Sequence, residues 1–474
     1  MNKHHKSAEE KLSVFTIDDA LLDQETLELA KSIASHNSVH KVIALPDIFM
    51  KPKMESPSSF AVSTYNDIVP HFSSTGLNCG MTVITTDITK EDLSNQNLDK
   101  FFELIKPIVP MNRETPVVSR EEIIQACLGG GEWAVDRFGL EPQTPIFIEN
   151  GGKTGNLDRQ TLVNLSTNPM LDKARFNFGQ LGGGNHFFEL QVVSDIYSPE
   201  IAKQLGLHQD QVCIMFHGGP GSFGLMGRVF ARRRYTALRH KIKLFPLKMF
   251  VHKTINPFTI KKRHKYYFSR EEFVPIHADS DEGLRLEQVT DATMNIGAAF
   301  RMCIFAHVTH ALKLVFGDSS QASLLYDSPH NSIYREEHQG QNVWMHRHNA
   351  CRCYPSNKFP NHPVFSSTGQ VALLPGDHIS ASHLAVPGPQ IEKTMYTVNH
   401  GFGETISQMY QRGLLSSVDN RLNTTTRRYD SQSNNVAELN HLPDEAVDRS
   451  INSLENSGLI DTVAKLRPRA NIRS

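Results

Sequence analysis

The sequence predicts an α+β fold built as a single large interwoven domain. Segments typical of strands and of helices are mixed along the chain, and neither an internal repeat nor a strong linker divides it. The length of 474 residues exceeds the usual size of one domain, so the missing linker is what favours one domain over two. We expect residues 1–12 to form a flexible N-terminus and residues 13–474 to form the folded domain.

Five short segments are predicted to be strands because they are rich in β-branched or apolar residues. They are expected at residues 42–47, 81–85, 187–193, 212–216 and 371–374. Pro46 is expected to stop the first strand, and the turn Pro375-Gly376 to stop the last. Metal-type side chains stand beside several of these strand ends, where rigid folds usually place their chemistry. We therefore expect the strand-end turns to form a central cleft that binds a metal.

Two helices are predicted with defined ends. Ser119 and Glu122 have the spacing of a capping box, which indicates a helix that runs to a glycine stop at residues 129–131. A long and mostly helical stretch is expected at residues 291–316, and Gly317 is expected to end it.

Composition indicates an ordinary globular protein, with 39% hydrophobic residues, 21% charged residues and a net charge of −1. No apolar run approaches the roughly 20 residues that a membrane span needs, and the N-terminus lacks the apolar core of a secretion signal. The six cysteines are sparse and follow no disulfide pattern, which fits a reducing compartment. We expect a cytoplasmic protein without a membrane partner.

Charge is unevenly distributed along the chain. Residues 211–270 contain fourteen Lys or Arg and no Asp or Glu, which predicts a salt-dependent attraction to a polyanion such as nucleic acid. Aromatic residues in this basic segment can stack on unpaired bases. The alternative is that the aromatics belong to the core and the charges form a solvated face. A second polar segment, residues 416–435, is expected to be a surface loop.

Five separated segments carry a metal-type ligand beside glycine or asparagine. The ligands are Cys79, His186, His217, His330 and His400. One thiolate and several imidazoles suit Zn²⁺, Mn²⁺, Fe²⁺ or Co²⁺ better than Mg²⁺ or Ca²⁺. Small neighbours indicate a backbone that approaches a cofactor closely. The alternative is that Cys79 is a small buried hydrophobe and that the histidines, which number 23 in the chain, are ordinary core or surface groups.

His400 differs from the other histidines because Gly401 and Gly403 leave its imidazole exposed on a tight turn. Such a position suits a nucleophile that accepts a bulky covalent group. Glu189 and Asp377 are acceptors that can orient a ring nitrogen or bind a nucleobase edge. On the residues alone, His400 is either a nucleophile or a fifth metal ligand.

Seven ordered motifs together resemble the RtcB family of RNA ligases, which use GTP and Mn²⁺. The motifs are Asn78-Cys79-Gly80, Gly184-Asn185-His186-Phe187 with Glu189, His217-x-Gly219, Asp327-x-x-His330-Asn331, His346-Arg347 with Ala350 and Arg352, Pro375-Gly376-Asp377 with Ala381-Ser382, and His400-Gly401-Phe402-Gly403. The resemblance spans about residues 40–474.

The resemblance implies a role for each matching residue. Cys79, His186, His217 and His330 match ligands of one or two Mn²⁺ ions, and His400 matches the histidine that GTP guanylylates. The positions that match the guanylate site are Asn185, Phe187, Glu189, Asn331, Pro375, Gly376, Asp377, Ser382, Gly401 and Gly403, with Arg473 in place of a terminal lysine. The implied partner is RNA with a 3′-phosphate or 2′,3′-cyclic phosphate end and a 5′-hydroxyl end. The resemblance leaves open an activating protein.

Three departures from the family pattern affect charge at the implied site. Gly76 stands where the family has a metal-binding Asp, so a second ion is expected to bind weakly or not at all. Gly221 and Glu404 each replace an arginine, and Glu404 reverses the charge beside a phosphate site. His378 and His383 stand where Met and Tyr are usual, a change of side-chain type.

These departures keep three alternatives open. The chain can be a ligation-deficient homologue that acts as a metal-dependent RNA-end phosphodiesterase, although hydrolysis has no need of His400. It can be an RNA-binding protein, although a binder has no need of all five ligands. A structural metalloprotein is the third alternative, and glycine-rich open turns argue against it because structural sites are closed.

Overall fold

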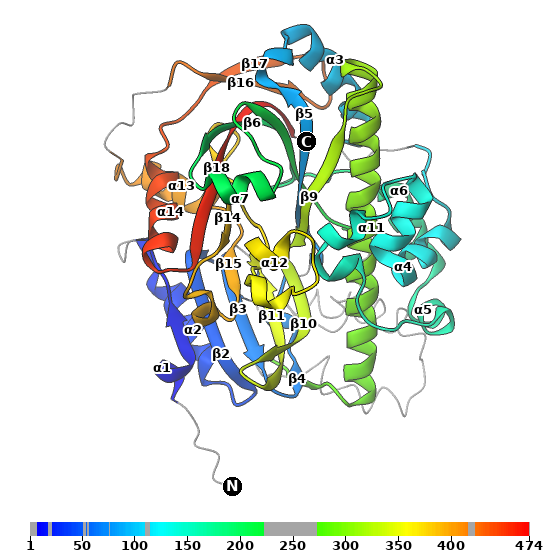
Figure 1. Ribbon diagram of the computed structural model, residues 1–474. Coiled ribbons are helices and arrows are strands. Elements are labelled where there is room, and N and C mark those ends of the chain that lie inside the picture. The colour runs from blue at the N-terminus through cyan, green and yellow to red at the C-terminus, as the bar shows by residue number, and fades with distance from the viewer. Residues whose placement is uncertain are drawn as a thin grey trace.

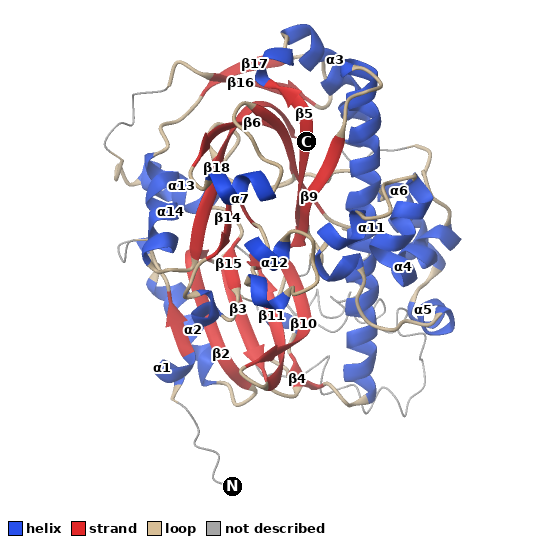
Figure 2. Cartoon of the chain, viewed as in Figure 1, coloured by secondary structure: helices blue, strands red, loops and turns tan. Residues whose placement is uncertain are grey.

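The computed structural model describes residues 7–17, 21–50, 54, 56–74, 76–109, 114–221, 273–415 and 422–473, and it shows two main sheets with helices packed around them (Figures 1 and 2). The mixture of sheets and helices in one continuous assembly confirms the predicted α+β class and the interwoven domain. Of the basic segment 211–270, residues 222–270, which contain all fourteen basic side chains, lie outside the described residues.

The smaller main sheet has five strands in the order β1-β2-β3-β11-β10. Their bounds are Leu12–Val14 (β1), Val39–Phe49 (β2), Ser58–Thr64 (β3), Gln341–His348 (β11) and Asn331–His338 (β10). Helices α1 (Ala8–Lys11) and α2 (Gln24–Ser35) lie beside it, and Leu29 and Ile33 of α2 pack on Val42 and Phe60. Two expectations are wrong here. Pro46 does not stop β2, because the pairing with β3 continues past an irregularity between Ala44 and Phe49. The flexible N-terminus expected at residues 1–12 is wrong for residues 8–12, which form α1 and the start of β1.

The larger sheet has its strands in the order β13-β14-β18-β6-β7-β5-β9. Their bounds are Ala372–Leu374 (β13), Ser382–Pro387 (β14), Ile460–Arg473 (β18), Phe187–Ile196 (β6), Gln211–Gly218 (β7), Gly80–Thr89 (β5) and Ala322–Pro329 (β9). All neighbours along this order are antiparallel. Four of the predicted strands, those at 81–85, 187–193, 212–216 and 371–374, therefore belong to one sheet.

The predicted polar loop 416–435 is wrong in part, because strand β16 (Thr425–Asp430) lies within it. This strand pairs with β17 (Val436–Asn440) and in parallel with β18. Tyr429 of β16 is buried and stacks on Phe102 with ring centroids 4.3 Å apart. A polar sequence thus becomes a strand because its partner is supplied from the far end of the chain.

Helices α3 (Asn95–Ile105), α4 (Arg120–Phe138) and α11 (Asp281–Phe316) form a layer with the larger sheet, and α11 runs along α4 in Figure 1. The capping box at Ser119 is confirmed. The glycine stop is wrong: α4 kinks at Gly130, whose φ is 55°, and then continues. A Cβ at Gly130 would lie 2.0 Å from the carbonyl oxygen of Gly152, so this close approach requires glycine.

Helix α11 begins well before the predicted residue 291, capped by Ser280, and ends at Gly317 as predicted. By length and composition it is the one helix of the described residues that meets the criteria for a membrane span. Half of its most apolar window is buried within the protein, and the helix packs against α3 and α4. Those contacts are the environment of a core helix.

The remaining helices and strands are short. The helices are α5 (Arg159–Leu165), α6 (Asn168–Asn177), α7 (Pro199–Gln204), α12 (Phe365–Thr368), α13 (Gly403–Gln411) and α14 (Glu445–Asn456). The 3₁₀ turns are η2 (Pro70–Phe72), η3 (Lys90–Asp92), η4 (Lys106–Ile108), η5 (Thr144–Phe147), η6 (Glu149–Gly152), η7 (Ser356–Lys358) and η8 (Ile391–Thr394). Two-stranded ladders join β12 (Ala350–Arg352) to β15 (Thr397–Asn399) and β4 (Asp67–Ile68) to β8 (Ile276–His277).

Candidate metal centre and histidine cluster

The register of the larger sheet brings the predicted metal ligands to one edge. Cys79 stands immediately before β5, whose first residues pair with the end of β7 that carries His217. On its other side, Gly80 pairs with Pro329, so β9 delivers His330 to the same edge. Phe187 of β6 pairs with His217, which places His186 beside it. Four segments far apart in sequence thus converge because their strand ends are aligned.

The convergence is close enough for shared metal binding. Cys79 Sγ lies 3.1 Å from His186 Nε2 and 3.1 Å from His217 Nε2. The ligand atoms of Cys79, His186 and His217 lie within 4.8 Å of one another, and so do those of His217, His330 and His400. The two groups of three share His217, so the five predicted residues form one continuous cluster.

His400 lies within this cluster, at the end of β15. Its ring stacks on that of His330, with centroids 3.8 Å apart and an interplanar angle of 17°, and its centroid is 5.0 Å from that of His217. Any ion that the cluster holds would therefore lie beside the ring of His400.

The ring of His217 is oriented as a metal ligand requires. His217 Nδ1 lies 3.0 Å from the carbonyl oxygen of Asn185, an acceptor that places the proton on Nδ1 and leaves the Nε2 lone pair facing Cys79. Burial lowers the pKa of His186 to about 4, against a smaller opposing contribution from the Gly182 backbone, so its imidazole is neutral at pH 7. Sulfur and neutral nitrogen donors in this arrangement fit a transition-metal ion.

Glycines beside the ligands are explained by close backbone contacts. A Cβ at Gly219 would lie 2.8 Å from the Cα of Cys79, and a Cβ at Gly80 would lie 2.7 Å from the carbonyl oxygen of Ser328. Gly401 has a φ of 77°, and a Cβ there would lie 2.7 Å from the carbonyl oxygen of Pro375. The local sequence pattern therefore reflects the packing of ligand turns on one another.

A buried ion pair supports the Cys79 turn, and sequence reasoning missed its cation. Arg301 of α11 donates from Nε to Asp327 Oδ1 at 2.6 Å and from Nη2 to Oδ2 at 2.8 Å. Its Nη1 and Nη2 also donate to the carbonyl and side-chain oxygens of Asn78, at 2.8 and 2.9 Å. The signal was available, because an arginine inside the apolar run 298–304 needs a buried partner.

Two of the predicted guanylate residues, Glu189 of β6 and Ser382 of β14, lie on strands that both pair with β18. Buried Glu189 accepts a hydrogen bond from Gln191 Nε2 at 2.9 Å, and the same nitrogen donates to Ser382 Oγ at 3.0 Å. Ser382 Oγ in turn accepts from the backbone N–H of Gly376 at 3.3 Å. Gln191, which sequence reasoning did not single out, therefore joins three of the predicted positions.

Other predicted positions fix the loops around His400. Asn331 accepts from the backbone N–H of Asn349 at 2.9 Å and donates to the carbonyl of Gly76 at 3.2 Å. Asp377 Oδ1 accepts from the N–H of Ile379 at 2.9 Å, and the carbonyl of Pro375 accepts from the N–H of Phe402 at 3.3 Å.

The last three predicted positions are placed as follows. The ring of Phe187 lies 5.8 Å from that of His217, and Gly403 begins α13 with open space where a Cβ would lie. Arg473 ends β18 and pairs with Asp430, while its side chain lies outside the described part of the chain.

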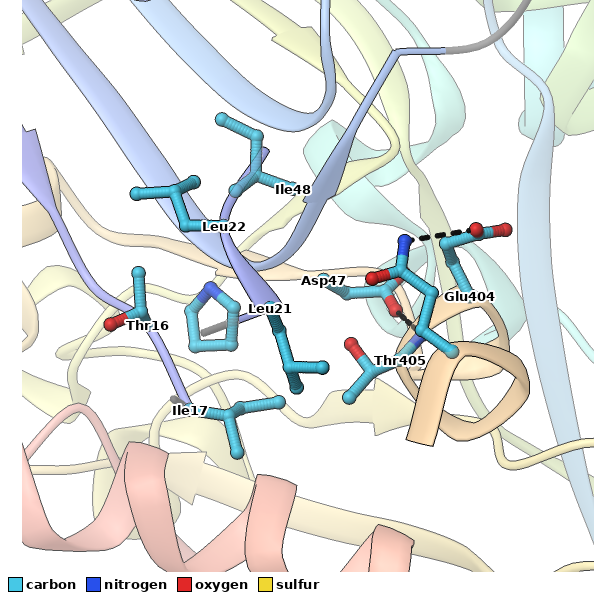
Figure 3. Close-up of a pocket in the computed structure, with 10 residues that line it drawn as sticks. Thr16, Ile17, Leu21, Leu22, Asp47, Ile48, Glu404 and Thr405 are labelled. Atoms are coloured by element: carbon cyan, nitrogen blue, oxygen red, sulfur yellow. Dashed lines mark hydrogen bonds between the residues drawn. The ribbon is translucent and has the colours of Figure 1, made fainter. Parts of the chain in front are cut away.

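The unusual residues Gly76 and Glu404 occupy different surroundings. A Cβ at Gly76 would lie 3.9 Å from the Cβ of Cys79 and no closer than 3.6 Å to its other neighbours, so a side chain fits there beside the cluster. Glu404 accepts a hydrogen bond from Gln408 at 3.0 Å and lines a small pocket formed by the N-terminal segment, β2 and α13 (Figure 3). In the same pocket, Asp47 accepts from the N–H of Thr405 at 2.6 Å and so caps α13.

The other departures lie in β14, its preceding turn and the end of the β7 segment. His383 is buried in β14, where burial lowers its pKa to about 3. The carbonyl of His378 accepts from Asn471 at 3.1 Å. Gly221 is the last described residue before position 273 and has a φ of 46°.

Sulfur and nitrogen donors gathered at the strand ends form a candidate site for a transition-metal ion. The sequence profile of one family, described as tRNA-splicing ligase RtcB, matches residues 29–474. The chain therefore belongs to the RtcB family, as the seven motifs indicated.

Individual relatives agree with this assignment. A protein of Methanopyrus kandleri named tRNA-splicing ligase RtcB is 27% identical over 82% of this chain and 41% of its own length. Proteins of the same name from Pyrococcus abyssi and Thermococcus kodakarensis are 27% and 24% identical, over 72% and 95% of this chain. The alignment covers 35% of the Pyrococcus protein and 92% of the Thermococcus protein, so the chain spans less than half the length of the first two relatives.

Proposed function

We propose that this chain is a GTP-dependent RNA ligase that joins RNA 3′-phosphate or 2′,3′-cyclic phosphate ends to 5′-hydroxyl ends, in tRNA splicing or RNA repair. The observation that carries the proposal is the position of His400, on a glycine-flanked turn and in ring contact with two residues of the metal cluster. The family and the name shared by its relatives, tRNA-splicing ligase, support RNA as the substrate.

Cys79, His186, His217 and His330 are proposed to hold Mn²⁺, as one or two ions. A bound ion supplies charge neutralisation at the phosphates. Because Gly76 supplies no carboxylate beside the cluster, one ion is proposed to bind more tightly than a second.

The chain's own contribution is a covalent step at His400. A ring nitrogen attacks the α-phosphorus of GTP, a P–N bond forms, and the bond to pyrophosphate breaks. The RNA 3′-phosphate oxygen then attacks the same phosphorus and releases the imidazole. Finally the 5′-hydroxyl attacks the activated RNA phosphorus, and GMP leaves with the bonding electrons. A cyclic phosphate end is opened to the 3′-phosphate by water before the second step.

The guanylate is proposed to lie along the turns that surround His400. Glu189, held by Gln191, presents a buried acceptor of the kind that binds a nucleobase edge. The further contacts are proposed for Asn185, Phe187, Asn331, Pro375, Gly376, Asp377, Ser382, Gly401, Gly403 and Arg473. The basic segment 211–270 is proposed to contact RNA phosphates.

One observation favours a second function. Gly221 and Glu404 leave the phosphate region without two cations, and Glu404 adds a negative charge at the start of α13. The second candidate is therefore a ligation-deficient homologue that acts as a metal-dependent RNA-end phosphodiesterase or as an RNA-binding protein. An activating protein is a further partner proposed for the ligase.

The test is incubation of the purified protein with Mn²⁺ and α-labelled GTP, followed by denaturing gel electrophoresis. An acid-labile label on the wild type that is absent from His400→Ala is expected. The exposed His208 supplies the matched control, His208→Ala, which should label as the wild type does. A metal-loaded wild type that takes up no label contradicts the ligase proposal and favours the second candidate.

A further inference from the structure

Four charged side chains, three from strands β10, β11 and β12 and one from the turn η6, are buried together near the histidine cluster. Glu149, Glu336, Arg347 and Arg352 are at most 6% exposed, and we call them the buried charge network. Arg347 forms a bidentate pair with Glu336, at 2.6 and 3.0 Å. Arg352 lies 3.8 Å from Glu149 and 3.9 Å from Glu336, so all four charges are connected.

The network is enclosed by further specific contacts. Arg352 donates to Asn150 Oδ1 at 2.6 Å, and its guanidinium lies 4.6 Å from the ring centroid of Tyr354. Burial alone would raise the pKa of Glu336, but the charge of Arg347 holds the pKa of this carboxyl well below its usual range. Burying charges is expensive, and well-packed apolar side chains are often at least as stabilising. The network therefore invites an explanation other than stability.

Arg347 and Arg352 lie on either side of a short turn that is hydrogen-bonded to the backbones of both stacked histidines, His330 and His400. Within it, the carbonyl of Asn349 accepts a hydrogen bond from the backbone N–H of His400 at 3.1 Å. The next residue, Ala350, donates its N–H to the carbonyl of His330 at 2.9 Å. One short turn thus holds the backbones of both His330 and His400.

The strand that leads into His400 is tied to the same network. Thr397 of β15 pairs with Arg352 of β12, and its hydroxyl accepts from Arg347 Nε at 3.1 Å. Asn349 itself has a φ of 48°, a left-handed conformation that its surroundings must maintain. The bracketing arginines and the Thr397 contact fix this turn from both sides.

We propose that the buried charge network is a positioning device for His400: it fixes the turn at Asn349 and strand β15, and so sets the imidazole for attack on the nucleotide. The contacts described above join its residues to one another, to Asn150 and to Thr397, and they reach His400 only through the backbone, so they are positioning residues. This inference rests on the proposed nucleotidyl transfer to His400 and deepens it.

The test compares Glu336→Gln and Thr397→Val with the wild type. Glu336→Gln keeps the shape of the side chain and removes the charge that holds Arg347. Thr397→Val is nearly isosteric and removes two hydrogen bonds of one hydroxyl, which accepts from Arg347 and donates to the carbonyl of Met395, so it serves if Glu336→Gln does not fold. The readouts are the rate of His400 labelling by α-labelled GTP, metal content by elemental analysis, and the unfolding temperature.

A misplaced nucleophile predicts a labelling rate lower by about 100-fold in Glu336→Gln, since small displacements have effects of that order. Loss of the Thr397 hydroxyl, and with it the hydrogen bond to the charged Arg347, predicts a fall of about 10-fold in Thr397→Val. Metal content per folded molecule should be unchanged. Asp444→Asn, which disrupts a comparably buried pair with Lys465 on β18, is the matched control and should label at the wild-type rate. Equal rates in all variants, or rates that fall only in proportion to metal content, overturn the inference.

A separate readout distinguishes failure of this inference from failure of the proposed function. If the wild type takes up no label, the proposed function fails, and diethyl pyrocarbonate then reports on His400 directly. Its modification rate, followed by peptide mass spectrometry relative to His208, should change in Thr397→Val and not in Asp444→Asn. An unchanged rate at His400 overturns the positioning role.

Discussion

Asp327→Asn is expected to destabilise the protein strongly, because it removes the negative charge that pairs with the buried Arg301. Both side chains are 0% exposed, and Arg301 makes two hydrogen bonds to Asp327 and two to Asn78. Breaking a buried pair by removing one partner costs about 3–5 kcal/mol in the free energy of unfolding. Since Asn78 precedes Cys79, metal affinity should fall as well.

The assay is urea unfolding followed by tryptophan fluorescence, with the metal removed so that stability alone is measured. Asp172→Asn is the control, because its partner Arg120 is 47% exposed and a surface pair of this kind contributes little. The reasoning is refuted if Asp327→Asn and Asp172→Asn unfold at the same urea concentration.

Three further perturbations have expected outcomes. Gly76→Asp should fold normally and raise the metal content measured by elemental analysis, because its Cβ has room 3.9 Å from that of Cys79; an unchanged content would show that this position does not face the ion. Gly401→Ala should lower the free energy of unfolding by about 1–2 kcal/mol and slow His400 labelling, because its φ is 77°; wild-type stability and rate would contradict this. Burial lowers the pKa of His346 from 6.5 to about 4, so the free energy of unfolding should fall by about 3 kcal/mol as the pH falls from 6.5 towards 4. Urea unfolding between pH 4 and 7 should show a flatter pH dependence in His346→Gln than in the wild type. An identical pH dependence would refute this.

The metal-ligand cluster could be predicted from the sequence because the residues that indicate it are neighbours in the chain. Glycine or asparagine beside Cys79, His186, His217 and His330 reports a close backbone approach that depends on the immediate neighbours, and the structure brings these residues together. Strand runs with β-branched residues were found for the same reason. Which atoms meet was beyond the pattern, because it depends on the register between strands.

What escaped prediction depends on partners distant in sequence. The helix α4 continues through Gly130 because the turn at Gly152 packs against it, and β16 forms because β18 supplies its ladder. Gln191 and the buried charge network are likewise defined only by their contacts across strands. A residue with ordinary neighbours in sequence gives no local sign of such a role.

The central claim is that GTP transfers its guanylate to His400. Peptide mass spectrometry of the wild type after incubation with GTP and Mn²⁺, at neutral to alkaline pH to preserve the P–N bond, tests it most directly. The account predicts one guanylate on the peptide that contains His400 and none on the peptides that contain His217 or His330. A guanylate on another residue, or none on a metal-loaded protein, would contradict it.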